Sequence, residues 1–231
     1  MFKHRHKFIC LIVILMALTL SAAAAQDNST DSVLASDVNV SSGSFEDLGD
    51  AIYYANDSDV ITVEGEYVKG EYQINVEKSV TIQSEGGAVI DANNTDELFF
   101  IDSCDVTFKN IAFVNSPYES IYLRNASLTL LDCTFINGGI RFYDGSLSII
   151  NSTFTGSHIN TYSLSEYGDL NIENSEFYTT DFSMYQSDFI NVNICDSVFI
   201  DPTGNPFNIN CQVFNFKNNF ITACPHKYHL S

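Results

Sequence analysis

The chain has 231 residues, of which 29 are acidic and 10 are lysine or arginine, giving a net charge of −19. Such a surface repels nucleic acid and anionic membranes, so neither is expected as a partner. It also repels polyuronate chains unless a cation bridges the two.

The first 43 residues are predicted to precede the folded part. Residues 1–25 begin with basic side chains, continue with an apolar run over 8–20 and end in small residues. That order is typical of a secretory signal peptide, so we predict a secreted or extracellular protein, with cell-surface association as an option. No second apolar run of about 18 residues follows, and no membrane span is predicted after signal removal. Residues 26–43 carry few bulky apolar side chains and are predicted to be a flexible leader.

Residues 44–58 change to helical periodicity, with apolar side chains recurring on one face. Ser44 followed by Asp47 resembles a capping box, and acidic residues crowd the first turn. A short amphipathic helix at this point would cover the open edge of the β-structure that follows, so we predict an N-terminal capping helix. Its apolar face consists of Phe45, Leu48, Ala51, Ile52 and Ala55.

Residues 59–224 repeat one pattern about every 22 residues, seen clearly in Leu147–Phe154. Positions one and three of the unit are apolar and position two is Thr, Ser or Asn, which is the period of a strand with one buried face. A fixed period in this range predicts a repeat architecture. The first apolar residues of successive units are 80, 106, 128, 147, 170, 192 and 214.

The fifth and eighth positions of the unit indicate how the chain turns and packs. Position five is always Asn or Asp, which tolerate the left-handed backbone and bond local backbone groups, so each unit contains a corner. Position eight is Phe in the five full copies and is predicted to stack in the core. We interpret the corner residues as a structural ladder and not as a metal or carboxylate row. The ladder consists of Asn110, Asp132, Asn151, Asn174, Asp196 and Asn218.

A third strand fits between the copies, as at residues 121–123 and 140–142. Three short strands per turn of about 22 residues predict an all-β parallel β-helix. The leucine-rich repeat is set aside because leucine is sparse. The outward positions of the third-strand column are predicted to be Tyr122, Arg141, Ser163 and Asn208.

Residues 225–231 are predicted to be a C-terminal tail. Cys224, His226 and His229 are metal-capable side chains near it, but a site needs a fourth ligand and a rigid frame. We therefore predict no metal site and no cofactor. Five cysteines lie beyond residue 25, an odd number that leaves at least one unpaired, and we predict mostly reduced thiols.

Residues 45–55, 59–67 and 80–94, together with repeats such as 147–154, resemble a known group. They are similar to the secreted right-handed parallel β-helix proteins of the pectin-lyase-like superfamily, and most of all to the adhesin-like surface proteins of methanogenic archaea. The resemblance covers about residues 44–222. It implies a right-handed solenoid of about seven coils with an N-terminal capping helix, and a role in attachment and cell-surface interaction.

The superfamily also includes polysaccharide lyases and hydrolases. Polygalacturonase-like members show Asn-Thr-Asp, Asp-Asp, His-Gly and Arg-x-Lys, of which this chain has only Asn94-Thr95-Asp96. Pectate-lyase-like members need an arginine base and acidic Ca²⁺ ligands. Beyond residue 25 the arginines are Arg124 and Arg141, and no acidic cluster accompanies them on the predicted column.

These observations favour a non-catalytic adhesin-like protein, not an enzyme, because fold alone does not confer activity. Its predicted partner is a polysaccharide or another cell surface, and its oligomeric state is left open. Tyr122 and Arg141 are the candidate ligand contacts, since an aromatic ring beside a cation suits a sugar. The alternative is a carbohydrate-active enzyme, either a polysaccharide lyase or a glycoside hydrolase.

Overall fold

The structure is a computed structural model in which part of the chain is described. The predicted signal peptide (1–25), most of the predicted leader (26–43) and the predicted tail (225–231) lie outside that part. The described residues are 36–40, 43–162, 168–202 and 208–222.

The described residues form one helix, α2 (Phe45–Tyr54), and short strands that pair in parallel into a single 18-stranded sheet. The strands of the first half are β1 (Asp37–Val40), β2 (Val60–Val63), β3 (Gly65–Val68), β4 (Ile74–Val76), β5 (Val80–Asp91), β6 (Phe99–Asp102), β7 (Asp105–Val114), β8 (Ile121–Leu131) and β9 (Thr134–Ile136). Those of the second half are β10 (Gly139–Ile150), β11 (Thr153–Thr155), β12 (His158–Tyr162), β13 (Gly168–Glu173), β14 (Glu176–Tyr178), β15 (Asp181–Cys195), β16 (Val198–Ile200), β17 (Asn208–Lys217) and β18 (Phe220–Thr222).

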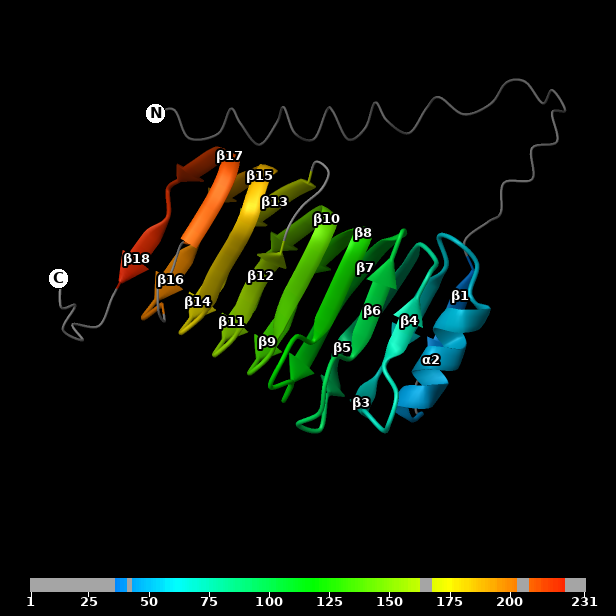
Figure 1. The fold of residues 1–231 in the computed structure, drawn as a ribbon. Coiled ribbons are helices and arrows are strands. Elements are labelled where there is room, and N and C mark those ends of the chain that lie inside the picture. Colours follow the sequence, from blue (N-terminus) through cyan, green and yellow to red (C-terminus); the bar gives the residue numbers. More distant parts are fainter. Residues whose placement is uncertain (1–35, 41–42, 163–167, 203–207, 223–231) are drawn as a thin grey trace, which may run out of the picture. The chain divides into compact units, whose positions relative to one another are not determined.

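Each strand pairs with its equivalent one coil later. Val106 of β7 lies opposite Leu128 of β8, and Leu128 in turn lies opposite Leu147 of β10. The coils therefore follow one another along the solenoid in sequence order, from β2 to β18 (Figure 1). The predicted all-β right-handed parallel β-helix of about seven coils, preceded by a helix, is confirmed.

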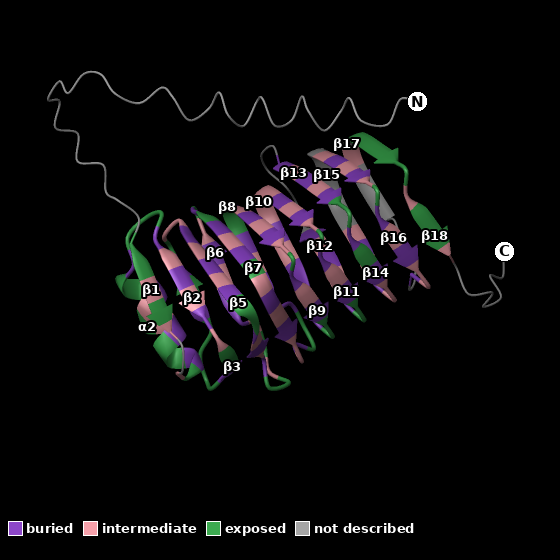
Figure 2. Ribbon diagram, turned by 180° about the vertical axis from the view of Figure 1, so that it is seen from behind, coloured by how far each residue is buried: buried purple, intermediate pink, exposed green. Residues whose placement is uncertain are grey.

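Alternate residues of each strand point into the coil, so buried and partly exposed positions alternate along the ribbons (Figure 2). The eighth residue of the repeat forms a stack of phenylalanine rings whose neighbouring centroids lie 4.6 to 5.2 Å apart. Stacked rings at the strand spacing exclude water from the whole length of the core. The stack consists of Phe113, Phe135, Phe154, Phe177 and Phe199.

A column of buried hydroxyl groups runs beside this stack. Ser175 Oγ accepts a hydrogen bond from the backbone N–H of Ser152 at 3.1 Å and donates one to the carbonyl of Glu173 at 2.8 Å. In the same way, Ser197 Oγ accepts a hydrogen bond from the Ser175 N–H, and Ser152 Oγ accepts one from the Cys133 N–H. Each coil thus satisfies a buried backbone N–H of the coil before it, which is where a parallel solenoid leaves donors without a ladder partner.

The corner residues of the repeat all have left-handed backbone conformations, with φ between 51° and 57°. Their amides also link coils, since Asn151 donates to Asp132 and Asn218 donates to Asp196 at 3.1 Å. These side chains bond each other and the backbone, as expected for corner residues. The residues concerned are Asn110, Asp132, Asn151, Asn174, Asp196 and Asn218.

A second left-handed corner follows the Phe stack and was not predicted. Its backbone N–H groups bond the carbonyl of the next coil, as Asn115 does to Ile136 and Asn137 to Thr155. Gly156 occupies the equivalent position one coil later, where φ is 58°. The second corner includes Asn115, Asn137, Gly156, Thr179 and Asp201.

Helix α2 covers the first coil. The capping box of Ser44 and Asp47 is present, and Phe45, Leu48 and Ile52 are buried. The prediction of a flexible leader over 26–43 is wrong for residues 37–40, which form β1 and pair in parallel with β2. The reason is that the alternate valines of this short segment pack against the core.

Candidate functional site

The cluster of ionisable side chains with the deepest burial joins three successive coils. Glu119 lies in the connection between β7 and β8, Arg141 lies on β10, and His158 is the first residue of β12. The Glu119 side chain is only 5% exposed and forms an ion pair with Arg141 Nη2. His158 Nε2 lies 3.7 Å from the same carboxylate oxygen.

The connection that carries Glu119 is longer than the equivalent connection of the next coil. Phe113 and Ile121 are the register partners of Phe135 and Ile140 one coil later. The first pair is eight positions apart in sequence and the second pair five. The three additional residues of the β7–β8 connection therefore lie outside the regular coil, beside the third-strand column.

Two glycines let the neighbouring coils close around this connection. A Cβ atom at Gly138 would lie 2.3 Å from Ser120 Oγ, and one at Gly139 would lie 2.4 Å from the His158 carbonyl oxygen. The Gly139 carbonyl accepts a hydrogen bond from the Ser120 N–H at 2.7 Å. The Gly-Gly pair thus makes room for both His158 and the segment that holds Glu119.

Glu119 remains ionised despite its burial. Burial by itself raises the pKa of this carboxyl, but the neighbouring His158 and the positive charge of Arg141 outweigh it and hold the pKa below its ordinary value. A buried carboxylate paired in this way fixes the orientation of both partners. It acts as an anchor and not as a proton donor.

An open cavity of about 610 Å³ lies over the cluster. Its volume is in the range of cavities that hold small ligands. The Asn160 Oδ1 atom in its wall is buried and receives no hydrogen bond from the described residues. Such an acceptor suits a hydroxyl group of a bound molecule. The polar lining includes Tyr118, Glu119, Arg141, His158, Asn160 and Asp181.

The structure places the two predicted ligand contacts next to each other but in different surroundings. Arg141 is the register partner of Tyr122, and it lines the cavity. The Tyr122 ring is instead stacked on Phe100, with centroids 5.2 Å apart, and meets Tyr143 edge-on at 5.4 Å. Their role as ligand contacts stays a prediction.

The predicted outward column contains one error of register. Asn160 is the partner of Arg141, and Ser183 follows Asn160 and precedes Asn208 in the column. Ser163 was assigned to this column, but it lies outside the described residues. The strand was placed about three residues too late, because residues that favour strands flank both positions in the sequence.

Sequence reasoning missed Glu119 and His158. The available signals were the pair Gly138-Gly139 and the uneven repeat step, which is 19 residues between 128 and 147 and 22 residues before it. The repeat shortens from 22 to 19 residues because the β7–β8 connection is long and the equivalent connection in the next coil is short.

The rest of the described chain offers fewer candidates. Arg124 pairs with Asp102 at 2.5 Å, but its side chain is half exposed and rests over the Phe100 ring. Among the described residues, no group of three or more His, Cys, Asp or Glu side chains is arranged to hold a metal ion. Over the same residues, none of the helices is long and apolar enough to cross a membrane.

No protein-family model and no curated protein matches the chain. Among solved structures, the R241A mutant of the PL6 family alginate lyase AlyGC is similar, with a TM-score of 0.45 and 14% identity. The enzyme without that mutation gives a TM-score of 0.39 and 13% identity. Each match covers 89% of this chain and 42% of the lyase, so the chain spans less than half the length of these relatives.

These comparisons correct two predictions. The similar structures are lyases, so the prediction of a non-catalytic adhesin-like protein, and with it the prediction that the chain is not an enzyme, is wrong. The alternative, a carbohydrate-active enzyme, is a proposal. The reaction is argued below from the residues of the site. The closeness to adhesin-like proteins of methanogenic archaea stays a prediction.

Proposed function

We propose that the chain is a carbohydrate-active enzyme that cleaves a uronate-containing polysaccharide by β-elimination at the Glu119–Arg141–His158 cluster. The observation that carries the proposal is the buried Glu119 carboxylate, which holds a guanidinium and an imidazole together at the wall of an open cavity. The two basic groups stand out in a chain whose net charge is −19. Arg141 in particular offers the carboxylate of an acidic polymer a contact of opposite charge.

β-Elimination on a uronate needs three groups. A cation must stabilise the charge that develops on the sugar carboxylate when the neighbouring C5 proton leaves, and Arg141 supplies it. A base must take that proton, and the imidazole of His158 supplies it. The C4–oxygen bond then breaks, a C4=C5 double bond forms, and the leaving oxygen takes a proton from the Tyr118 hydroxyl. Both side chains recover their protonation states by exchange with water.

The position of Glu119 argues for a lyase against a glycoside hydrolase. A hydrolase uses a pair of carboxyl groups, one of which must hold a proton near neutral pH. The Glu119 pKa is held below its ordinary value, so this carboxyl does not keep a proton. The guanidinium of Arg141 beside it favours the ionised form, which is the opposite of what an acid that donates to a glycosidic oxygen needs.

The test is the formation of unsaturated uronides from alginate, polygalacturonate and a glycosaminoglycan by the purified chain. We expect product from at least one polymer, and a loss of at least about 100-fold in Arg141→Ala and in His158→Gln. Arg124→Ala is the matched control, because this arginine also pairs with an acidic residue on the coil exterior. It should keep the activity of the unmodified chain.

Each other outcome contradicts the proposal. The absence of unsaturated product from all three polymers would refute elimination. New reducing ends without a double bond would indicate hydrolysis. An equal loss in the Arg124 and Arg141 variants would show that the effect is one of folding.

We further propose that the chain belongs with the pectin-lyase-like β-helix proteins and acts outside the cell. The parallel coil with an N-terminal helical cap supports the first part. The signal-peptide pattern of residues 1–25 supports the second. Recovery of the protein from the culture medium, with a new N-terminus near residue 26, would test it.

A further inference from the structure

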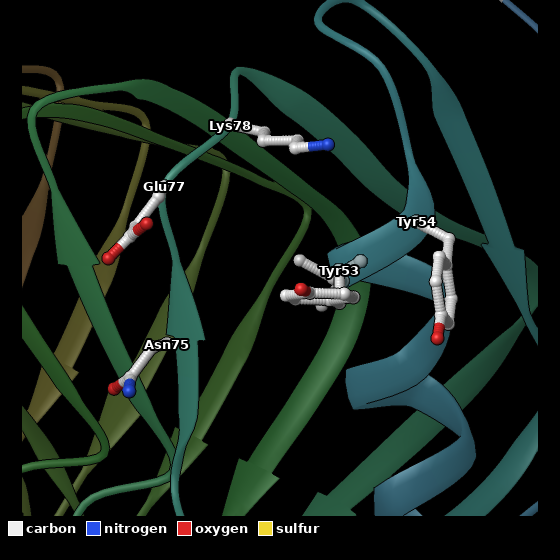
Figure 3. A pocket seen from close by; sticks show the side chains of 6 residues that line it. Tyr53, Tyr54, Asn75, Glu77 and Lys78 are labelled. Carbon is white, nitrogen blue, oxygen red and sulfur yellow. The ribbon is translucent and has the colours of Figure 1, made fainter.

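A second hollow lies at the N-terminal end of the solenoid, between helix α2 and strand β4. It has a volume of about 530 Å³ and is lined by the last turn of the helix and by the segment from Asn75 to Lys78. Figure 3 shows the Tyr53 ring between the helix and the strand that carries Asn75, with Glu77 just after that strand. A smaller hollow of about 330 Å³ shares Tyr53 and Asn75 and continues toward Tyr72.

The tyrosines of this groove are not needed for the cap. The helix covers the first coil with Phe45, Leu48 and Ile52, which are all buried. Tyr53, Tyr54 and Tyr72 are 71%, 77% and 76% exposed. Polar residues would serve as well at three such positions, and exposed aromatic surface that clusters in a hollow is typical of an interaction site.

The polar groups of the groove are suited to hydroxyl groups. Asn75 is exposed on β4 between two buried residues, and its Oδ1 accepts a hydrogen bond from Gln73 Nε2 at 3.3 Å. Carboxylates at Glu46, Asp50 and Glu77 add acceptors along the same surface. Aromatic faces that pack on sugar C–H groups, beside acceptors for hydroxyls, make up a carbohydrate site.

The charge of the groove decides which carbohydrate it takes. Three carboxylates line it, whereas the ammonium group of Lys78 is held by the Ala55 carbonyl at the end of the helix, at 2.6 Å. An anionic polymer would be repelled. Tyr53 and Tyr54 meet edge-to-face at 86° with centroids 5.0 Å apart. Two rings in this arrangement leave a ring face open and do not form an aromatic cage around a cation.

We infer that the α2–β4 groove binds an uncharged polysaccharide, with Tyr53 as the central stacking platform. The ten residues of α2 give it a length of about 15 Å, enough for several sugar units in an extended chain. Gly49 lets the helix pack closely against β4 beside the groove, because a Cβ atom there would lie 3.3 Å from Ile74 Cγ1. This site is separate from the Glu119 cluster and does not depend on the proposed elimination.

The test is calorimetric titration of the full chain with uncharged hexasaccharides of β-1,4-glucan, β-1,3-glucan, β-1,4-xylan and β-1,4-mannan. We expect at least one to bind, Tyr53→Ala to weaken it at least about tenfold, or 1.4 kcal/mol, and Tyr53→Phe to stay within about threefold. Tyr178→Ala is the matched control, because Tyr178 is a partly exposed tyrosine on β14, outside the groove. Arg141→Ala should bind as the unmodified chain does, which separates this site from the proposed reaction.

Failure of all four hexasaccharides to bind would overturn the inference. Equal affinity in Tyr53→Ala and the unmodified chain would also overturn it, because the sugar would then lie elsewhere. Choline or a polyuronate serves as a charged probe. Tyr53-dependent binding of either one, with no binding of the uncharged sugars, would refute the assignment of ligand class.

Discussion

Ser175→Ala tests the column of buried hydroxyls that joins the coils. The substitution removes two hydrogen bonds, one accepted from the Ser152 N–H and one donated to the Glu173 carbonyl. Ser175 is 1% exposed, so water cannot take the place of the hydroxyl. The Glu173 carbonyl keeps another partner, because it also accepts from the Asn151 N–H at 3.0 Å. The principal loss is therefore the partner of the Ser152 amide.

A buried backbone N–H without a partner costs about 1–3 kcal/mol. We expect Ser175→Ala to lower the free energy of unfolding by about 2 kcal/mol. For a domain of this size that corresponds to a fall in melting temperature of about 4–8 °C. Ser175→Cys should cost less, since Cys133 occupies the same column and its thiol still donates to the Leu131 carbonyl.

The assay is urea denaturation followed by circular dichroism, together with hydrogen exchange of the Ser152 amide. Ser148→Ala is the control, because Ser148 lies on the outer, partly exposed face of β10. The reasoning fails if Ser175→Ala costs no more than the control. It also fails if the Ser152 amide keeps its protection in the variant.

Three further predictions concern single side chains. The pKa of Glu119 is held below its usual 4.5, so its ionised pair stabilises the fold above that pH and this contribution is lost on further acidification. The stability difference between the unmodified chain and Glu119→Gln should shrink between pH 7 and about pH 3 in urea melts, and a constant difference would contradict the sign. Burial raises the pKa of Cys133 to about 11, so iodoacetamide at pH 8 should modify the less buried Cys195 first, by peptide mass mapping, unless the chain is unfolded. Gly139→Ala should cost about 1–3 kcal/mol in urea melts, because its Cβ would meet backbone at His158, and a neutral result would refute that crowding.

The fold could be predicted because each coil repeats the same local chemistry. A single unit such as Leu147–Phe154 already indicates a strand with inward apolar side chains, a left-handed corner and a stacking phenylalanine ring. The other copies carry the same pattern. The third strand was harder, since its sequence is irregular. The placement of Ser163 in the column held by Asn160 shows how a short apolar pattern leaves the register open.

The candidate site could be predicted only in part. Arg141 was singled out because it is one of two arginines beyond residue 25. Glu119 is 22 residues before it and His158 is 17 after it, so nothing local connects the three. The three side chains meet because successive coils stack on one another. The connection that carries Glu119 does not follow the repeat from which the fold was predicted. Prediction from periodicity fails where a site depends on a break in that periodicity.

The long β7–β8 connection has a consequence for how such a protein can change over evolutionary time. Its two ends are held to the next coil, because the Asn115 N–H bonds the Ile136 carbonyl and the Ser120 N–H bonds the Gly139 carbonyl. Residues can therefore be gained or lost between these ends without shifting the register of the neighbouring strands. Lengthening a surface loop is energetically mild, about 0.6 kcal/mol for each doubling. Small insertions at this bend can thus reshape the proposed site, while the stacked scaffold stays intact.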